Sequence, residues 1–345
     1  MSDESDAPAP AEATAVTFRW DLDKTYLRTE FESLRKIVKI PFEAGTDKVH
    51  LPGVPELIRA LRRHAADAGK TPYVFFLSAS PPQIGGAIRE KLELDGVEFD
   101  GITFKDQLRH LVRGRWGTLR EQVGYKLGEL LAARAAGPAA STEVLFGDDW
   151  ESDPLIYSLY ADILRGSIDA DLLRRVLVAV DVGKGPVQKI LALEGVLRGT
   201  APDTVGRIFI NLEKRTPPSR FRSYGSRVVP TFNTLQASAA LLQSGFLDLD
   251  GVMEVARALL DAAGGEGYRL RNSIDDLTRR GHLRLETRDR LVRRLSREKL
   301  APLSKGEQAL RARLRAALAR FRRGKRQSGV GGADWESLVQ QFEEG

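Results

Sequence analysis

The chain has 345 residues, of which 29% are charged, and a formal net charge of +6. This length is sufficient for one large domain or two modest domains with their own cores. Cysteine is absent, which excludes disulfides, thiolate zinc sites and cysteine nucleophiles. No apolar stretch approaches the roughly 20 residues that span a bilayer. The acidic, Ala- and Pro-rich N-terminus differs from a signal peptide, so we expect a disordered tail over residues 1–14 and a cytoplasmic protein.

Strand-like and helix-like segments alternate between residues 16 and 165. Each short apolar segment is followed by one or two segments with helical spacing. The expected strands are 16–23, 73–80, 99–104 and 142–149, and the expected helices are 29–40, 53–69, 82–94, 118–137 and 153–164. This alternation predicts an α/β fold in which a parallel sheet carries helices on both faces.

The sequence after residue 166 predicts mainly helices. One further segment, 205–213, has the pattern of a strand that could extend the same sheet, and the glycines of "GGEG" at 264–267 predict a flexible break. The predicted organisation is an α/β domain over 15–263, with its core motifs in 16–165, then a basic helical region over 268–326. A flexible tail is expected over 327–345.

Acidic residues follow two of the predicted strands. In "RWDLDKT", Asp21 and Asp23 would share one face of an extended strand, roughly 7 Å apart, and "FGDD" ends another strand with Asp148 and Asp149. Because neighbouring carboxylates resist ionising together, the first pair implies a metal ion or a cationic side chain between them. The carboxyl ends of parallel strands lie at one sheet edge, where ligands bind. We therefore expect these four aspartates and Ser78 to converge.

Four stretches together resemble the haloacid-dehalogenase phosphatase superfamily, and within it the catalytic domain of the fungal actin-patch phosphatidate phosphatases and their bacterial relatives. "DLDKT" (21–25) is similar to the D-x-D-x-T signature, and "LSASPPQI" (77–84) to a strand ending in Ser that is followed by S-P-x-Q. "YKLGELL" (125–131) supplies a helical lysine, and "FGDDWESDPLIY" (146–157) is similar to G-D-x-x-x-x-D-P-x-I-Y. The resemblance implies a three-layer α/β/α domain with a minimal cap and a helical C-terminal extension.

The resemblance also implies Mg²⁺-dependent hydrolysis of a phosphomonoester through an aspartyl-phosphate. Asp21 would attack phosphorus, and Asp23 would protonate the leaving oxygen and then deprotonate water. Ser78 would donate a hydrogen bond to the phosphoryl group, and Lys126 would place a cation against it. Lys105 is the alternative to Lys126.

The implied metal ligands are Asp21, the backbone carbonyl of Asp23 and Asp148, because Mg²⁺ prefers hard oxygen ligands. The carboxylate that completes the set is left open between two residues. Alignment to the D-P-x-I-Y stretch favours Asp153, whereas Asp149 is adjacent to Asp148 and also acidic.

The residues implied to bind substrate are Thr25 and Ser80, and a hydrogen bond within its own loop is the alternative role of Thr25. Lys24 occupies a position where the fungal proteins usually have an acidic residue, which leaves the substrate preference open. Phosphatidate or another lipid phosphate is the first candidate substrate. The alternatives are a phosphate on a protein or nucleic acid, and a non-catalytic scaffold with the same fold.

Two basic segments bear on the partner of the protein. "RHLVRGRW" (109–116) could hold an anionic head group or form a solvated loop. "LRARLRAALARFRRGKR" (310–326) predicts a basic amphipathic helix, and residues 305–326 could contact an anionic membrane peripherally. A helix packed on its own domain is the alternative, and nucleic acid is less favoured because aromatic stacking platforms are few. The oligomeric state is left open.

Overall fold

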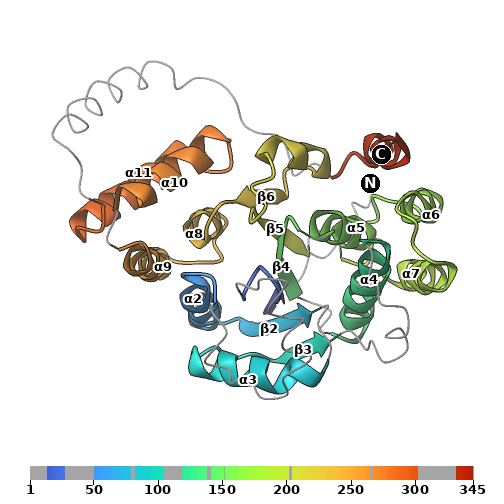
Figure 1. Ribbon diagram of the computed structural model, residues 1–345, viewed down its shortest axis with the longest axis horizontal. Helices are drawn as coiled ribbons and strands as arrows, with labels where there is room; N and C mark the ends of the chain where they lie inside the picture. The colour runs from blue at the N-terminus through green and yellow to red at the C-terminus, as the bar shows by residue number, and fades with distance from the viewer. Residues whose placement is uncertain are drawn as a thin grey trace, which may run out of the picture.

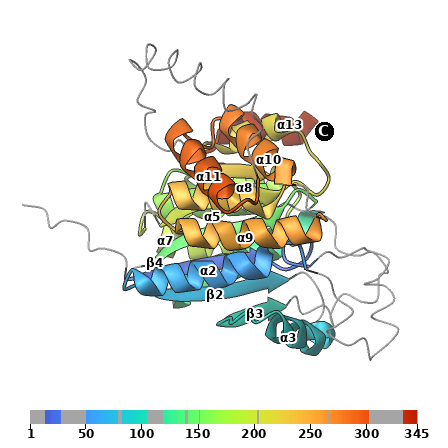
Figure 2. The same ribbon diagram turned by 90° about the vertical axis from the view of Figure 1, so that its left-hand side faces the viewer.

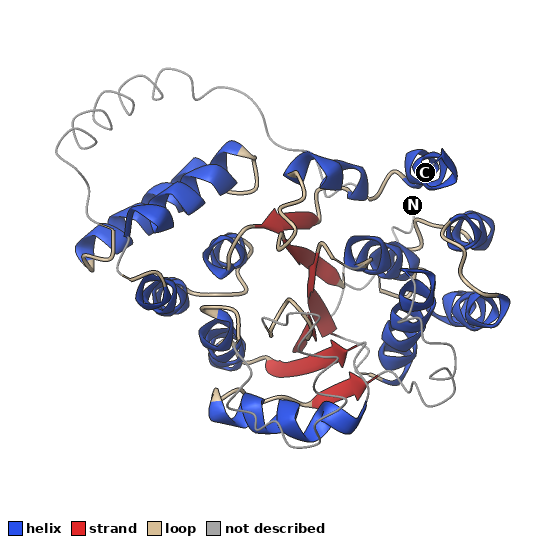
Figure 3. Cartoon of the chain, viewed as in Figure 1, coloured by secondary structure: helices blue, strands red, loops and turns tan. Residues whose placement is uncertain are grey.

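The computed structural model describes residues 14–27, 50–78, 82–104, 119–137, 141–150, 152–201, 204–264, 267–301 and 332–344. Its centre is a six-stranded parallel sheet with the strand order β3-β2-β1-β4-β5-β6 (Figure 3). The strands are β1 (Ala15–Asp21), β2 (Thr71–Ser78), β3 (Gly101–Phe104), β4 (Ser141–Asp148), β5 (Val205–Asn211) and β6 (Val228–Thr231). The predicted parallel sheet is confirmed, and segment 205–213 extends it beside β4.

Helices cover both faces of the sheet, so the fold has three layers (Figures 1 and 2). One hydrophobic core joins the sheet to α2 (Val54–Asp67), α3 (Gly85–Leu94), α8 (Thr234–Gln243), α9 (Leu249–Ala262), α10 (Gly267–Arg279) and α11 (Leu285–Arg297). A second core joins the other face to α4 (Leu119–Ala136), α5 (Asp153–Arg165), α6 (Ala170–Ala179), α7 (Lys184–Leu197) and α13 (Trp335–Glu344). Two 3₁₀ segments, η2 (Pro82–Ile84) and η4 (Pro218–Tyr224), complete the described elements.

Strand β1 presents apolar side chains to the first core and polar side chains to the second, as the period of two in a strand requires. Towards the first core, Trp20 stacks on Phe146 of β4, and Phe146 stacks on Phe209 of β5, with ring centroids 3.7 and 5.2 Å apart. Towards the second core point Arg19 and Asp21, which are both buried. The sheet therefore carries buried charges on its α4–α5 face.

A buried ionic network holds the first of these charges. The Nε and Nη2 atoms of Arg19 donate to the two carboxylate oxygens of Glu143 on β4, at 2.7 and 3.2 Å. The same carboxylate accepts from the hydroxyl of Tyr160 at 2.8 Å and lies 3.5 Å from Arg134 Nη1. Burial disfavours the guanidinium charge, but the Glu143 carboxylate outweighs it, and the pKa of Arg19 is raised. A cavity of about 360 Å³ lies beside this network, lined by β1, β2, β3, β4 and α4.

The C-terminal third differs from the sequence-based expectation. Helices α10 and α11 belong to the core that α2, α8 and α9 form with the sheet, so residues 267–301 pack on the α/β domain rather than standing apart. The tail expected to be flexible over 327–345 contains α13. Its apolar residues Trp335, Leu338 and Val339 are spaced as one helix face and are buried in the second core. Trp335 Nε1 also donates to Asp162 of α5 at 2.8 Å.

Several expected features lie outside the described residues. They are the acidic tail up to residue 13, the helix at 29–40, the basic segment at 109–116, and the amphipathic helix within 305–326. Among the helices that the structure does describe, none combines the length and apolar character that crossing a membrane requires.

One histidine should make the stability of the fold depend on pH. Burial, together with the cations of Arg280 and Arg207, lowers the pKa of His282 to about 4, and Asp276 opposes this only in part. The unfolded chain, with an ordinary histidine pKa near 6.5, therefore binds the proton first as the pH falls. Stability is complete above pH 6.5 and declines between pH 6.5 and 4.

We expect His282→Gln to reduce this decline by about 2 kcal/mol, a value discounted for the partial exposure of the ring. The measurement is urea unfolding of the wild type and the variant at pH 7 and pH 4.5. His64→Gln on α2 is the control for loss of a histidine elsewhere. A His282→Gln protein that loses as much stability as the wild type would contradict the expectation.

Candidate active site

The acidic strand ends lie at the point where the sheet changes its winding direction. In the strand order 3-2-1-4-5-6, the connections from the neighbouring strands β1 and β4 pass to opposite faces of the sheet. Parallel sheets with this order bind ligands in the crevice beyond the carboxyl ends of those two strands. Asp21 is the last residue of β1, Asp148 is the last of β4, and Ser78 is the last of β2. The topology alone therefore marks this edge as a candidate site.

Three carboxylates form a buried cluster at this edge. Asp21, Asp148 and Asp153 each place one carboxylate oxygen within 4.8 Å of the others. The ammonium group of Lys126 lies 2.7 Å from Asp21 Oδ1 and 2.8 Å from Asp153 Oδ1, and the lysine is 0% exposed. A cationic side chain is thus present, and its contacts with Asp21 and Asp153 bridge these two carboxylates. Lys126 and the three carboxylates together carry a formal charge of −2.

The chain is built locally to bring Asp153 into this cluster. Asp153 is the first residue of α5, where the helix dipole favours a negative charge. Its Oδ2 atom accepts a hydrogen bond from the backbone N–H of Asp148 at 3.2 Å. A Cβ atom at Gly147 would overlap the Asp153 carboxylate, so the close approach requires glycine before the strand end. Lys126 reaches the cluster from the middle of α4.

Asp23 and Ser78 form a second contact beside the cluster. The hydroxyl of Ser78 donates to Asp23 Oδ2 at 3.0 Å. Ser78 is therefore placed to orient the Asp23 carboxylate, a contact that the sequence analysis did not include.

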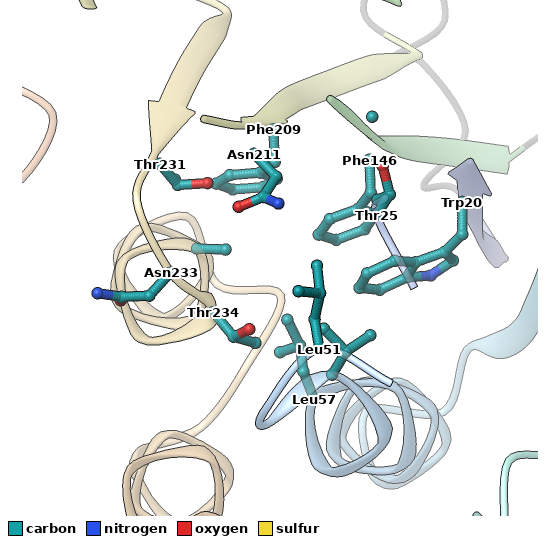
Figure 4. Close-up of a pocket in the computed structure, with 13 residues that line it drawn as sticks. Trp20, Thr25, Leu51, Leu57, Phe146, Phe209, Asn211, Thr231, Asn233 and Thr234 are labelled. Atoms are coloured by element: carbon teal, nitrogen blue, oxygen red, sulfur yellow. The ribbon is translucent and has the colours of Figure 1, made fainter. Parts of the chain in front are cut away.

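Thr25 is buried in the loop after β1, and its Oγ1 atom has no hydrogen-bond partner among the described residues. It lines a cavity of about 30 Å³ between the sheet and the helices α2 and α8, beside Trp20 and Phe146 (Figure 4). That space holds about one water molecule. Ser80 and Lys105, also named from the sequence, lie outside the described residues.

Asp149 has a different position from its neighbour Asp148. Its carboxylate accepts backbone N–H groups of Lys214 and Thr216 at 2.8 and 3.0 Å, which fixes the loop after β5. Of the two aspartates that the sequence left open as metal ligands, the structure groups Asp153, and not Asp149, with Asp21 and Asp148.

Trp150, Lys214 and Asn211 also lie at this edge, next to Lys24, and the sequence analysis did not name these three residues. The Nζ atom of Lys24 lies 3.1 Å from the ring centroid of Trp150, and Lys214 Nζ lies 4.4 Å from it. Asn211, at the end of β5, donates from Nδ2 to the carbonyl of Lys24 at 3.1 Å. A signal was available for Asn211, because 205–213 had the pattern of a strand that could extend the same sheet, and the end of such a strand would reach the same edge.

Tyr157 of α5 is buried close to the cluster. Burial raises the pKa of Tyr157 well above its usual value, and the nearby Asp153 raises it further. Its hydroxyl therefore stays protonated and donates to the carbonyl of Phe146 at 3.2 Å.

The cluster has the chemistry of a divalent-cation site. Carboxylate oxygens are the ligands that Mg²⁺ prefers, and a divalent cation would cancel the charge that Lys126 leaves uncompensated. Asp21, Asp148 and Asp153 could therefore hold such an ion. Comparison of the chain with protein-family models, with curated proteins and with solved structures found no match. The function is accordingly inferred from the geometry of the site.

Proposed function

We propose that the protein is a Mg²⁺-dependent phosphomonoester hydrolase of the haloacid-dehalogenase type, acting through an aspartyl-phosphate on Asp21. The observation that supports this most directly is the buried cluster at the sheet edge. There, the Asp21 carboxylate contacts Lys126 at 2.7 Å and lies within 4.8 Å of two further carboxylates. A scaffold would gain nothing from burying three like charges, because each loses its hydration.

In the proposed reaction, a carboxylate oxygen of Asp21 attacks phosphorus and the bond from phosphorus to the leaving oxygen breaks. Asp23, held by Ser78, gives its proton to that oxygen. A water molecule then attacks the phosphorus of the aspartyl-phosphate, its proton passes to Asp23, and the bond to Asp21 breaks. Inorganic phosphate leaves, and both aspartates return to their starting states.

Lys126 neutralises and orients the nucleophile in this scheme, since its ammonium group contacts both Asp21 and Asp153. Asp21, Asp148 and Asp153 would hold the Mg²⁺, which when bound supplies positive charge against the phosphoryl oxygens. Thr25 has a buried hydroxyl that could contact substrate.

Phosphatidate or a related lipid phosphate is the substrate proposed first, on the resemblance of the motifs. Neither the cap region after residue 27 nor the basic segment 305–326 lies among the described residues. The minimal cap, the peripheral membrane contact and the cytoplasmic location therefore stay predictions.

The test is phosphate release from phosphatidate in mixed micelles and from an aryl phosphate, with and without Mg²⁺. We expect Mg²⁺-dependent release by the wild type and a loss of about 10⁴-fold or more for Asp21→Asn, because the attacking oxygen is replaced by a poor nucleophile. Asp171→Asn, at an exposed position in α6, is the matched control for loss of a carboxylate.

The outcomes test the identity of the substrate and the reaction mechanism separately. Release from the aryl phosphate alone would retain Asp21 as the nucleophile and direct the substrate search to soluble, protein or nucleic-acid phosphates. Trapping with borohydride, which reduces an aspartyl-phosphate to homoserine, should label Asp21. Folded protein that releases no phosphate from either substrate in the presence of Mg²⁺ would overturn the proposal in favour of a binding module.

A further inference from the structure

A cavity of about 360 Å³ lies between α4 and the sheet, on the face that carries the ionic network of Arg19 and Glu143. Strands β1, β2, β3 and β4 line one side of it, and the second half of α4 lines the other. Its lining includes none of Asp21, Ser78 and Lys126, so the cavity is separate from the candidate active site. The volume falls in the range of ligand-binding cavities, and it is more than twice the roughly 150 Å³ that accommodates benzene.

Small residues on both sides leave this space open. On α4, Leu130 is buried against the sheet, but the next lining positions on the helix include Ala133 and Ala136, whose methyl groups are too short to fill the gap. On the sheet, Gly101 begins β3, and a Cβ atom there would lie only 3.1 Å from the ring of Phe75. Ala133 and Ala136 are exposed, so the cavity reaches the surface of the protein beside the end of α4.

The wall of the cavity contains a buried hydrogen-bond donor with capacity beyond its ion pair. Arg19 lines the cavity and is 8% exposed. A guanidinium has five N–H groups, of which two donate to Glu143. The neighbouring hydroxyl oxygen of Tyr160 can accept no more than two others. These neighbours therefore leave at least one N–H group for an acceptor in the cavity, and such an acceptor offsets the cost of burying the donor.

The charges in the wall favour a ligand without a charge of its own. Glu143 lines the same cavity and accepts two hydrogen bonds from Arg19. An anionic ligand would be repelled by this carboxylate, and it would lose its hydration on entering the cavity. A carbonyl oxygen would accept from the guanidinium without either cost. Phe75, Leu77 and Leu130 line the cavity as well, so the rest of the ligand should be apolar.

We infer that this cavity binds a small uncharged molecule, about the size of two fused rings, in which a carbonyl oxygen accepts a hydrogen bond from Arg19. The inference goes beyond the proposed phosphatase activity and does not depend on it. In the sheet, Leu77 pairs with Asp21, and on α4 Leu130 lies one turn after Lys126. The bound molecule would thus contact the elements that carry the candidate catalytic residues without occupying their site.

The test is an NMR titration of the full-length protein with three probes of similar shape. They are 1-indanone, which has one carbonyl oxygen, indane, which has no acceptor, and indane-1-carboxylate. We expect 1-indanone to bind about tenfold more tightly than indane, the difference that one hydrogen bond to a charged group provides. Replacing the ion pair as a unit, with Arg19→Met and Glu143→Gln, should reduce this preference without leaving either charge buried alone.

A second pair of variants tests the location of the site. Ala133→Phe places a ring at an exposed position of the cavity lining and should abolish the binding of 1-indanone. Ala135→Phe, at an exposed position of α4 outside the lining, is the matched control and should bind 1-indanone as the wild type does. Because both positions are exposed, neither variant is expected to unfold the protein, and the melting temperature of each checks this.

Three results would overturn the inference. The first is that 1-indanone does not bind, or binds equally well to the Ala133→Phe and Ala135→Phe proteins. The second is equal affinity for indane and 1-indanone, which would mean that Arg19 contributes no hydrogen bond. The third is tightest binding of the carboxylate, which would mean that Arg19 and Arg134 together recognise an anion. None of these measurements requires phosphate release, so their outcome is independent of the proposed function.

Discussion

Replacing Lys126 with methionine is expected to lower the free energy of unfolding by about 3–5 kcal/mol in metal-free buffer. The Lys126 ammonium group is fully buried and contacts Asp21 at 2.7 Å and Asp153 at 2.8 Å. Methionine has a similar length and fills the same space without a charge. The variant would leave three carboxylates buried within 4.8 Å of one another and without that cation. Urea unfolding in the presence of a chelator measures the loss.

The same variant should be rescued by metal. If Asp21, Asp148 and Asp153 hold a divalent cation, Mg²⁺ binds the folded Lys126→Met protein and stabilises it by mass action. We expect Mg²⁺ to raise the stability of this variant more than that of the wild type, because the ion replaces a missing charge. Phosphatase activity should still fall by about 10²–10³-fold, the usual loss when one stabilising cation or donor is removed.

Two further variants make this prediction specific. Adding Asp153→Asn to Lys126→Met removes one of the repelling carboxylates and should recover part of the lost stability. Lys189→Met, which breaks an exposed ion pair with Glu129, should cost no more than about 1 kcal/mol. If Lys126→Met is no less stable than Lys189→Met, the carboxylates of the cluster are not charged in the folded protein.

Local patterns were sufficient to predict the part of the site that lies on regular elements. Asp21 and Asp148 each end a predicted strand, and the carboxyl ends of the strands in a parallel sheet all lie at the same edge. Asp153 and Lys126 were named through motifs that lie on α5 and α4, and the structure brings both to Asp21. The order of elements likewise predicted a parallel sheet with helices on both faces, because right-handed β-α-β connections allow few other arrangements.

Other features depend on partners that are distant in sequence. Strand β6 has four residues and contains Pro230. Proline is tolerated in an edge strand, but in a sequence it argues against a strand. Helix α13 forms where Trp335 meets Asp162, across 173 positions of the chain. The contacts of Lys24 and Lys214 with Trp150 join three loops, and the conformation of a loop is set by such contacts rather than by periodicity.

Glu143 is the strongest example of a residue whose role only the fold reveals. In the sequence it follows two hydroxyl-bearing residues at the start of a strand, which would suggest a solvent-facing position. In the structure it is buried and paired with Arg19, 124 positions away, through two hydrogen bonds. A buried ion pair adds little stability compared with apolar residues of the same size. Removing one partner is nevertheless costly, because the other charge then stays buried without its counter-ion.

Glu143→Gln is therefore expected to lower the free energy of unfolding by about 3–5 kcal/mol, although glutamine has nearly the same shape. Arg19 would keep its charge in a buried position with only a neutral acceptor. Adding Arg19→Met removes that charge, while the glutamine can still accept from Tyr160. The double variant should thus be more stable than Glu143→Gln alone.

Glu254→Gln, which breaks an exposed pair with Arg63, should cost less than about 1 kcal/mol. Strictly additive losses in the urea unfolding of the single and double variants would contradict a coupled pair, because additivity is expected only of sites that do not interact.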